Sequence, residues 1–516
     1  MQPIKLIAGF LTVGVWTLLS RVLGFVRDIL IAASLGAGPV AEAFLIAFSL
    51  PNMFRRFFAE GAFNMAFVPL FSKKLEEPDE AREFARDAFT GLATVLVVFT
   101  VIAVAAMPWL VLAMASGFLG DERYPLTVIY GRIAFPYILF ISLAALLSGV
   151  LNSTGRFVAA AAAPVLLNVM FISALFLGES LGWPVGDTLI WTVPLAGLAQ
   201  LALVWIAASR AGFRLTFRRP RLTPDLRRLA IIAGPAMLAG GVVQVNLLVG
   251  RQVASFFDGA IAWLNYADRL YQLPLGVVGI AVGVVLLPEL SRRLAAGDEQ
   301  GGRESFNRAC EFSLAMTVPA AVALMAIPVP LVSVLFERGA FDSDDTYATA
   351  LAVAIYGAGL PAFVLQKTLQ PLYFAREDTK SPFRFAVVSM LVNAAVAIGL
   401  APLVGYAAAA MGTTLAAWSM VALLWWKSRR MGPAAAFDDR FRRRIWRTVA
   451  AALVMGLTLM VAFRLTAPVF DMTLIRYLAL AGLVALGIAV YFAVGSLFGA
   501  FRLSEFTRAM RRRSAT

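Results

Sequence analysis

The sequence predicts an all-α polytopic membrane protein with about 14 transmembrane helices: two six-helix lobes related by a parallel repeat, followed by two C-terminal helices. Three observations lead to this prediction: the composition, the spacing of long apolar runs, and the distribution of basic residues among the loops. Of the 516 residues, 60% are hydrophobic and 15% are charged, and the mean hydropathy is +0.80. Soluble domains are about half apolar and about a quarter charged, so lipid must be the main solvent of this chain.

Residue types that are absent or rare exclude several kinds of chemistry. The chain contains no histidine and one cysteine, Cys310, for which we expect a buried thiol. Ser-His-Asp and Cys-His nucleophilic sites, histidine-ligated metals and four-cysteine zinc sites are therefore excluded, and we predict no enzymatic activity, no metal site and no cofactor. The net charge of +14 is typical of basic cytoplasmic loops beside anionic lipid, so we expect membrane lipids and not nucleic acid as partners.

Apolar runs of about 20 residues are long enough to cross the hydrocarbon core as helices. We interpret the first run as a retained helix and not a signal peptide, because Ser20-Arg21 interrupts it and no small-residue cleavage site follows. Glycine, proline and charged residues within the longer early runs predict bends there. The N-terminal lobe, residues 1–220, contains six such runs, at 8–34, 40–70, 88–113, 128–151, 159–179 and 187–208.

The second half repeats this pattern. Pro69 and Pro288 are 219 residues apart in similar seven-residue segments; Pro136 and Pro361, like Asn168 and Asn393, are 225 apart. Six helices is an even number, so both halves would enter the membrane with the same polarity, as in a parallel repeat. The C-terminal lobe, residues 221–432, has runs at 229–254, 262–290, 310–335, 346–374, 384–402 and 405–426, and residues 433–516 add 446–466, 475–498 and a basic C-terminal tail.

Basic residues alternate between loops as the positive-inside rule requires. With the N-terminus in the cytoplasm, the loops predicted inside include 209–228, with seven arginines, and 427–447, with eight lysines and arginines. The loops predicted outside contain few basic residues beyond Arg123, Arg338, Arg464 and Arg476. We therefore predict an even number of helices, with the N- and C-termini both cytoplasmic.

The most informative residues are ionisable groups inside the predicted spans. Each costs about 2.5–3.5 kcal/mol at a helix centre, so such groups usually face a cavity or a partner. Arginines outnumber acids here, and a guanidinium matches phosphate oxygens, which predicts a cationic cavity for an anionic headgroup. The alternative is that these residues form ion pairs between helices, while the outermost arginines contact lipid phosphates. The charged residues and their polar neighbours are Ser20, Arg21, Arg27 and Asp28 in the first span, Glu42, Asn52, Arg55, Arg56 and Glu60 in the second, and Asp268 and Arg269 in the eighth.

Helical geometry relates the charges of the first span. Arg21 and Asp28 are seven residues apart, so they share a helical face with Gly24. Arg27 lies about 120° from Arg21, so one cavity can receive both arginines only if the helix bends or the cavity is wide. Gly24 permits such a bend, or the close approach of another backbone.

Several motifs closely resemble the MurJ (MviN) family of lipid II flippases, within the multidrug/oligosaccharidyl-lipid/polysaccharide (MOP) exporter superfamily. The resemblance extends in order along essentially the whole chain, and its first two motifs are long enough to be specific. The motifs are Ser20–Asp28, the run from Leu50 to Phe63, Phe135-Pro136-Tyr137, Leu151-Asn152 with Arg156-Phe157, Ala267–Leu270 and Phe374–Lys380.

The resemblance implies a flippase that carries lipid II, an undecaprenyl-pyrophosphate-linked disaccharide-peptide, from the cytoplasmic to the periplasmic leaflet of a bacterial inner membrane. The family's cavity arginines correspond to Arg21, Arg27 and Arg269, with Arg55 and Arg56 as further contributors. Ser20, Asp28, Glu42, Asn52, Glu60 and Asp268 would support them, and the helices after residue 440 would form a groove for the polyprenyl tail. Gln272 stands where a glutamate is common in the family, which puts in doubt a role for a carboxylate in ion coupling there.

We expect transport by alternating access, in which two lobes expose one cavity first to the cytoplasm and then outside. The sequence leaves open whether the membrane potential or a counter-ion drives release, and it does not give the precursor's exact chemistry or the oligomeric state. The alternatives are a MOP exporter of another polyprenyl-linked glycan or of cationic drugs, a membrane-bound glycosyltransferase or phosphatase, and a scaffold. The arginine excess, the extra helix pair and the absence of histidine argue against these.

Overall fold

The computed structural model describes residues 3–56, 58, 62–214, 216, 218–470, 472 and 474–500. The described residues form α-helices joined by short turns, with two 3-10 turns and one isolated β-bridge, between Arg338 and Phe341. The predicted all-α fold class is therefore confirmed. By packing, the chain divides into two compact units: unit 1 is Met1–Ala262 with Arg338–Phe341, and unit 2 is Trp263–Glu337 with Asp342–Thr516.

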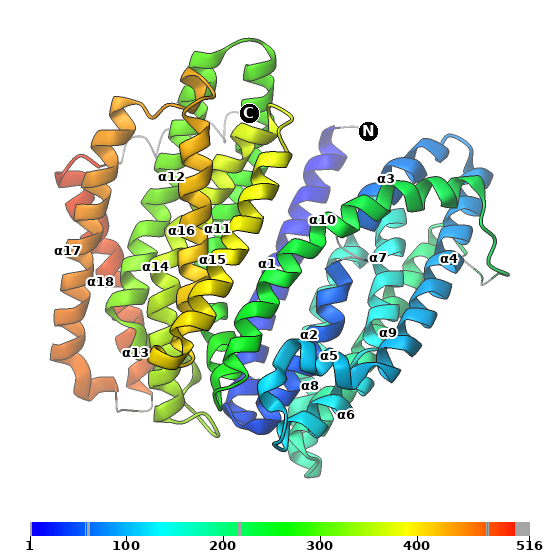
Figure 1. Ribbon diagram of the computed structural model, residues 1–516, viewed down its shortest axis with the longest axis horizontal. Coiled ribbons are helices and arrows are strands. Elements are labelled where there is room, and N and C mark those ends of the chain that lie inside the picture. Colours follow the sequence, from blue (N-terminus) through cyan, green and yellow to red (C-terminus); the bar gives the residue numbers. More distant parts are fainter. Residues whose placement is uncertain are drawn as a thin grey trace. The chain divides into compact units, whose positions relative to one another are not determined.

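Unit 1 contains the helices drawn from blue to green in Figure 1. Local sequence explains where several of them begin: a proline, whose fixed φ suits the first turn, opens α2, α4 and α10. Thr223 also caps α10, because its hydroxyl accepts a hydrogen bond from the Leu226 N–H at 3.3 Å. The elements are α1 (Pro3–Leu35), α2 (Pro39–Arg55), α3 (Ala62–Lys74), α4 (Pro78–Ala105), α5 (Met107–Ala115), η2 (Ser116–Phe118), α6 (Arg123–Ala134), α7 (Tyr137–Ser153), α8 (Val158–Leu181), α9 (Val185–Arg210) and α10 (Pro224–Ala254).

Unit 2 begins near the start of α11 and extends to the C-terminus. Aspartate side chains cap two of its helices: Asp298 accepts from the Gly301 N–H at 2.8 Å, and Asp342 accepts from the Asp345 N–H at 3.0 Å. The elements are α11 (Ala260–Ala295), α12 (Glu299–Ala326), α13 (Pro328–Phe336), α14 (Ser343–Phe374), α15 (Lys380–Val404), α16 (Ala407–Ser428), η3 (Pro433–Ala435), α17 (Asp439–Phe470) and α18 (Ile475–Leu497).

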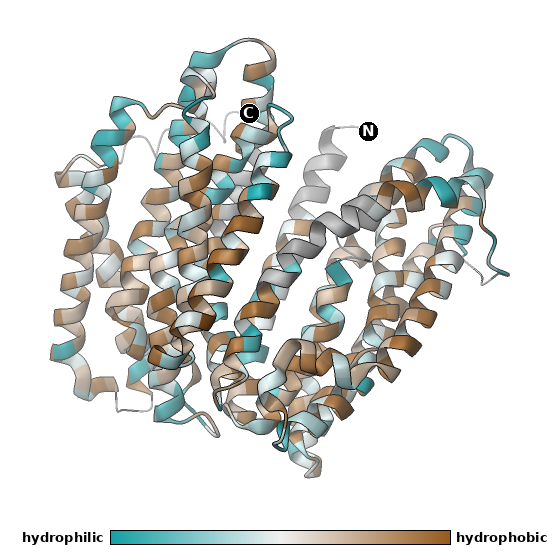
Figure 2. Cartoon of the chain, viewed as in Figure 1, coloured by the Kyte–Doolittle hydropathy of each residue, from teal (hydrophilic) through white to brown (hydrophobic). Residues whose placement is uncertain are grey.

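Each of the fourteen predicted spans overlaps one helix or two consecutive helices. Three spans are interrupted, and they become the pairs α4 and α5, α6 and α7, and α12 and α13. The span at 40–70 contains α2 and α3, and residues 57 and 59–61 between them lie outside the described residues. In the described part of the chain, ten helical segments are long and apolar enough to cross a membrane. Within each unit, apolar residues cover the middle of the helices and hydrophilic residues gather at their ends (Figure 2). The multi-pass prediction is confirmed, and the count of fourteen stays a prediction.

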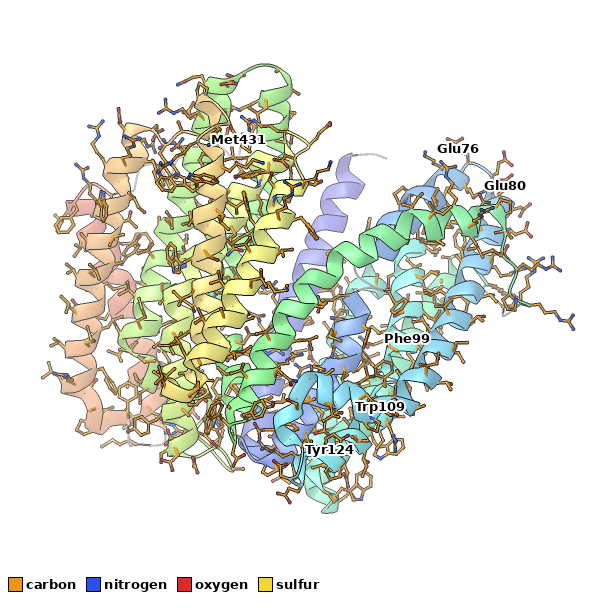
Figure 3. All side chains as sticks on the ribbon, viewed as in Figure 1. Glu76, Glu80, Phe99, Trp109, Tyr124 and Met431 are labelled. Carbon is orange, nitrogen blue, oxygen red and sulfur yellow. The ribbon has the colours of Figure 1, made fainter. Side chains whose placement is uncertain are left out.

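Side chains on and near α4, α5 and α6 show the same separation between the middle and the ends of unit 1. Glu76 and Glu80 lie at one end of the unit, Trp109 and Tyr124 at the other, and Phe99 between them (Figure 3). The core of unit 1 contains aromatic side chains: the centroid of the Phe48 ring on α2 lies 5.6 Å from the centroid of the Phe171 ring on α8. This core fixes α2 against α8, the helix that also contacts the charged part of α1.

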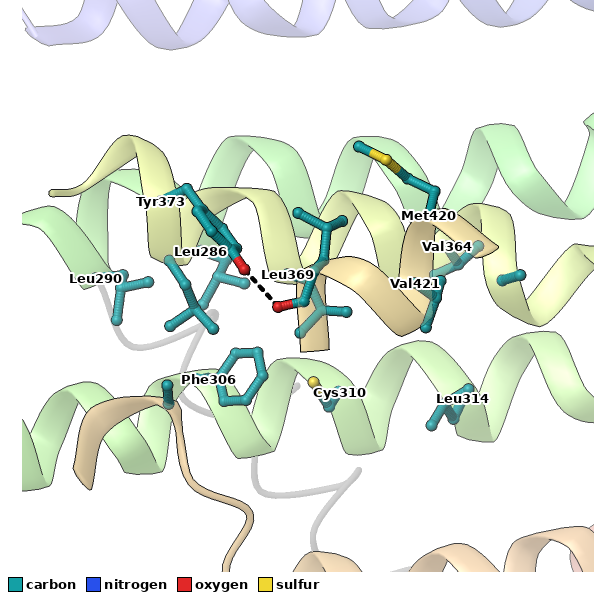
Figure 4. Packing of buried hydrophobic residues seen from close by; sticks show 14 of the residues in the cluster. Leu286, Leu290, Phe306, Cys310, Leu314, Val364, Leu369, Tyr373, Met420 and Val421 are labelled. Atoms are coloured by element: carbon teal, nitrogen blue, oxygen red, sulfur yellow. Dashed lines mark hydrogen bonds between the residues drawn. The ribbon is translucent and has the colours of Figure 1, made fainter. Parts of the chain in front are cut away.

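The core of unit 2 joins α12, α14 and α16. Phe306, Cys310 and Leu314 line one side of α12, and Tyr373 on α14 donates a hydrogen bond from its hydroxyl to the Leu424 carbonyl (Figure 4). Cys310 is fully buried, as predicted for this thiol.

The packing units differ from the predicted lobes at residues 1–220 and 221–432. α10 packs in unit 1, against α3, α4 and α5, where Gln252 accepts a hydrogen bond from the Ser116 N–H at 2.8 Å. A Cβ on Gly117 would lie 2.5 Å from the Ser255 backbone, so only glycine permits this approach. The helices after residue 433 pack within unit 2, where α17 contacts both α12 and α18. Packing and sequence repeat thus divide the chain at different places, and the lobe boundaries stay a prediction.

Candidate functional site

A buried polar cluster joins α1 to α8 in the middle of their apolar surfaces. The Arg27 guanidinium donates from Nε and Nη2 to Asp28 Oδ1, at 3.0 and 2.7 Å, and from Nη1 to Asn168 Oδ1 at 3.0 Å. The Asn168 amide in turn donates to the Ser20 carbonyl at 2.9 Å, with the Ser20 hydroxyl at 3.4 Å and the Pro164 carbonyl at 3.2 Å. Three predicted site residues, Ser20, Arg27 and Asp28, therefore meet at one asparagine that the prediction did not include.

Small residues on α1 make room for this cluster. A Cβ on Gly24 would lie 3.6 Å from both the oxygen and the nitrogen of the Asn168 amide, so this glycine faces the asparagine directly. Asn168 thus spans two turns of α1, from Ser20 past Gly24 to Arg27. On the next turn of α8, the ring of Phe171 lies 5.5 Å from the Arg27 guanidinium carbon, within reach of a cation–π interaction. At Gly24 the close contact is with an asparagine side chain, and not with another backbone.

Arg21 has different surroundings from the rest of the first motif. Its side chain is exposed, whereas Arg27 is only 8% exposed. This part of α1 presents many side chains outward, including Leu18 and Val22. Arg21 and Asp28 share a helical face by periodicity, but they lie two turns apart along the axis, and the buried cluster includes only Asp28.

The predicted residues of the second span occupy the end of α2. Asn52 donates from its amide to the Phe48 carbonyl of the preceding turn at 2.8 Å, and Arg55 is half-buried. Arg56 is exposed and lies directly after the last residue of α2. Glu60 lies outside the described residues.

Glu42 belongs to a separate buried cluster. Its carboxylate is 1% exposed, accepts a hydrogen bond from Arg123 Nη1 at 2.9 Å and another from the Ile261 N–H at 3.1 Å. Arg123 also contacts Asp121 at 2.5 Å and Asp258 at 3.0 Å, and its hydrogen bond lowers the pKa of the Asp121 carboxyl. The structure thus assigns Glu42 to a link between α2, α6 and the start of α11, away from the cluster around Arg27.

Asp268 and Arg269 lie on α11 in unit 2, and both are half-buried. The Gln272 amide donates a hydrogen bond to the Asp268 carboxylate. A neutral amide therefore lies beside this acid. The convergence of Arg269 with the arginines of unit 1 stays a prediction.

Sequence reasoning missed two residues of these clusters. Asn168 was noted only as a match within the repeat, and Arg123 was assigned to an outside loop. An asparagine in the middle of an apolar 24-residue helix is itself a signal, because an amide in lipid needs a hydrogen-bonding partner. The signal for Arg123 was weaker. Its buried partner is the acid in α2, which is far away in sequence, so no local pattern identifies the ion pair.

The fold and the buried arginine cluster define a polytopic membrane transporter, since ionisable groups held within apolar helices usually mark a transport pathway. The family model described as lipid II flippase MurJ matches residues 31–493, so the chain belongs to the MurJ family. It is 45% identical to "Probable lipid II flippase MurJ" of Rhizobium meliloti (strain 1021), over 98% of this chain and 97% of that protein. It is 35% identical to "Lipid II flippase MurJ" of Burkholderia cenocepacia, over 98% of this chain and 99% of that protein.

Solved structures agree with this assignment. A structure titled "Lipid II flippase MurJ, inward closed conformation" covers 94% of this chain and 98% of its own, with a TM-score of 0.79 and 25% sequence identity. An inward-facing multidrug resistance MATE family transporter of the MOP superfamily covers 80% of this chain and 95% of its own, with a TM-score of 0.66. At 13% identity, the second likeness shows only that the fold is shared.

Proposed function

We propose that this chain carries lipid II from the cytoplasmic to the periplasmic leaflet of the bacterial inner membrane, and that Arg27 is a central part of its pyrophosphate-binding site. Family membership supports the substrate, because the relatives that match over the whole chain are described as lipid II flippases. The observation that carries the site is the guanidinium of Arg27, buried in a transmembrane helix and fixed on two sides.

The charge balance around this site supports an anionic ligand. The predicted site has five arginines and four acids in its sequence, so pairing among them leaves an excess of positive charge. Two of the acids have arginine partners in the structure: Glu42 pairs with Arg123, and Asp28 pairs with Arg27. Guanidinium groups bind phosphate oxygens through paired hydrogen bonds, and a pyrophosphate offers several such oxygens.

Arg27 retains the capacity to bind a phosphate in its present position. A guanidinium has five N–H donors, and the contacts with Asp28 and Asn168 use three of them. The remaining two include one on each terminal nitrogen, which is the pairing that a phosphate accepts. In an alternating-access cycle, the inward-open cavity would bind the headgroup at Arg21, Arg27 and Arg269, and the outward-open cavity would release it while the lipid tail stays in the bilayer.

A pocket in unit 2 supports the proposed place of the polyprenyl tail. A cavity of about 270 Å3 lies between α12, α17 and α18, and Phe312, Met316 and Phe492 line much of its wall. Its other walls include Arg308, Arg440 and Arg444 around Glu311. An apolar wall beside basic residues is suited to a polyprenyl chain near its phosphate end.

The remaining parts of the proposal concern placement and energy. Both termini would lie in the cytoplasm, because the basic loops 209–228 and 427–447 would then face anionic lipid. Transport would need no covalent chemistry and no cofactor. The bias toward release would come from the membrane potential, worth about 2.3 kcal/mol per charge per 100 mV, or from a counter-ion.

Transport of fluorescent lipid II in proteoliposomes tests this proposal. We expect Arg27→Ala and Arg269→Ala each to reduce the initial rate at least tenfold, because each removes a charged hydrogen-bond donor from the substrate. Arg430→Ala is the matched control, since Arg430 lies beyond α16 with its guanidinium 5.5 Å from the Trp426 ring. Unchanged transport by folded Arg27→Ala protein would contradict the site.

A further inference from the structure

We propose that Asn168 is the positioning residue of the substrate site: its amide fixes the Arg27 guanidinium relative to the backbone of α1. The proposal rests on the proposed function, in which Arg27 binds the pyrophosphate. In this proposal Asn168 on α8 orients Arg27 on α1, 141 positions earlier in the chain.

The contacts of Asn168 explain how it would act. Its oxygen accepts from Arg27 Nη1 at 3.0 Å, while its nitrogen donates to the Ser20 carbonyl at 2.9 Å. One rigid amide therefore connects the flexible end of a long side chain to the backbone of the same helix, two turns away. The Pro164 carbonyl, 3.2 Å from the nitrogen, fixes the amide to α8 itself. The amide orientation follows from these partners, because Arg27 offers only donors and the two carbonyls offer only acceptors.

Asp28 by itself cannot supply this orientation. It accepts hydrogen bonds from Nε and Nη2 of Arg27, but it is the next residue on the same helix and moves with it. Asn168 is neutral, so it adds a directional contact without cancelling the positive charge that a phosphate needs. It is 5% exposed, and Gly24 leaves it the space to approach α1, so a residue of another shape would not fit in the same way.

The chain contains a matched control for this role. Asn393 corresponds to Asn168 in the internal repeat and is 1% exposed on α15. It packs against Gly412 of α16, where a Cβ would lie 2.5 Å from its oxygen. Leucine has the same branched shape as asparagine without hydrogen-bonding atoms. Asn168→Leu removes the amide that contacts Arg27, and Asn393→Leu removes a buried amide of equal size from the corresponding place in unit 2.

The experiment measures binding of the purified full chain to lipid II and, in parallel, to undecaprenol, which has the tail but no pyrophosphate. We expect Asn168→Leu to weaken lipid II binding roughly tenfold, the scale of a hydrogen bond to a charged group, and to leave undecaprenol binding unchanged. Asn393→Leu should change neither affinity. In an Arg27→Ala background, Asn168→Leu should cause no further loss, because a positioning residue acts only through the group that it positions.

Three results would overturn the proposal: equal losses for lipid II and undecaprenol, equal losses for the two leucine variants, or additive losses of Asn168→Leu and Arg27→Ala. If Asn168→Leu does not fold, Asn168→Ala with the same two ligands decides the question. The underlying site is tested separately, because unchanged lipid II binding by Arg27→Ala would reject the proposed function whatever the Asn168 variants do. Full loss in Arg27→Ala with no loss in folded Asn168→Leu would reject the positioning role alone.

Discussion

Asn168 and Asn393 occupy corresponding positions of the two halves, yet their surroundings differ. Asn168 on α8 contacts the charged part of α1, whereas Asn393 on α15 packs against a glycine of α16. The first helix of the second half, α10, has its main contacts with α3, α4 and α5 in unit 1. The repeat therefore copies the asparagine, and in unit 1 this residue holds an arginine of the predicted site.

The two packing units also differ in the charged side chains that they bury. Among the described residues, the charged side chains that are buried are Arg27, Asp28, Glu42 and Arg123, and all four lie in unit 1. The buried polar side chains of unit 2 are uncharged in the part of the chain that the structure describes, with Asn307 and Thr317 as examples. A buried ion pair is costly to desolvate, so unit 1 keeps its charges for a reason other than stability. The buried Arg27 of unit 1 is the one on which the proposed substrate site rests.

The largest effect that we expect is at Glu42. Glu42→Ala would leave Arg123 with only its partly exposed partners, Asp121 and Asp258, and breaking a buried pair typically costs about 3–5 kcal/mol. The control in unit 2 is Glu311→Ala, because Glu311 contacts three arginines that are all partly exposed and should lose about 1 kcal/mol. Thermal unfolding of both variants in detergent measures the difference. Equal losses would show that buried charge does not distinguish the units.

The next effect is smaller, and its sign should differ between the two glycines that face the asparagines. In Gly412→Ala the new Cβ would lie 2.9 Å from the Asn393 backbone oxygen, so the helices must separate at a cost of about 1–3 kcal/mol. In Gly24→Ala it would lie 3.6 Å from the Asn168 amide, an ordinary contact. Alanine also favours a helix by about 0.5–1 kcal/mol, so this variant should be neutral or stabilised. Unfolding midpoints measured side by side decide this, and a loss in Gly24→Ala as large as that in Gly412→Ala would contradict it.

The smallest effect concerns the turns between helices, where the halves also differ. In the α14–α15 turn the Ser381 hydroxyl, with Lys427, lowers the pKa of Asp378 to about 2, whereas the corresponding position of the first half is Ser153. Because the folded pKa lies below the ordinary 3.8, the stabilisation is fully present above about pH 4 and is lost as the pH falls toward 2. We expect Asp378→Asn to lower the free energy of unfolding by about 1 kcal/mol at pH 7. Below pH 4 the difference in free energy of unfolding between this variant and the unchanged protein should become smaller. Unfolding midpoints of both proteins between pH 7 and pH 3 measure this difference. A difference that does not change with pH would contradict the proposed role of Asp378.

The residues of the first motif show how far prediction from the sequence reached. Periodicity placed Gly24 and Asp28 on one face. Gly24 suggested a bend or the approach of another backbone, whereas the structure places the Asn168 side chain there. Periodicity did not separate the exposed Arg21 from the buried Asp28, because burial depends on where the neighbouring helix crosses. Glu42 illustrates the same limit, since its partner Arg123 lies 81 positions away and no local pattern identifies that contact.

The sequence by itself determined the solvent of this protein, its helical class and the helix that carries the buried arginine, because these depend on composition and on periods within a single segment. Its motifs also determined the family. Only the tertiary structure decided which charges neutralise one another, where α10 packs, and that a neutral amide from α8 holds Arg27. Those outcomes depend mainly on contacts between segments 81 to 141 residues apart, and the free energy of such contacts is set by packing and not by local sequence.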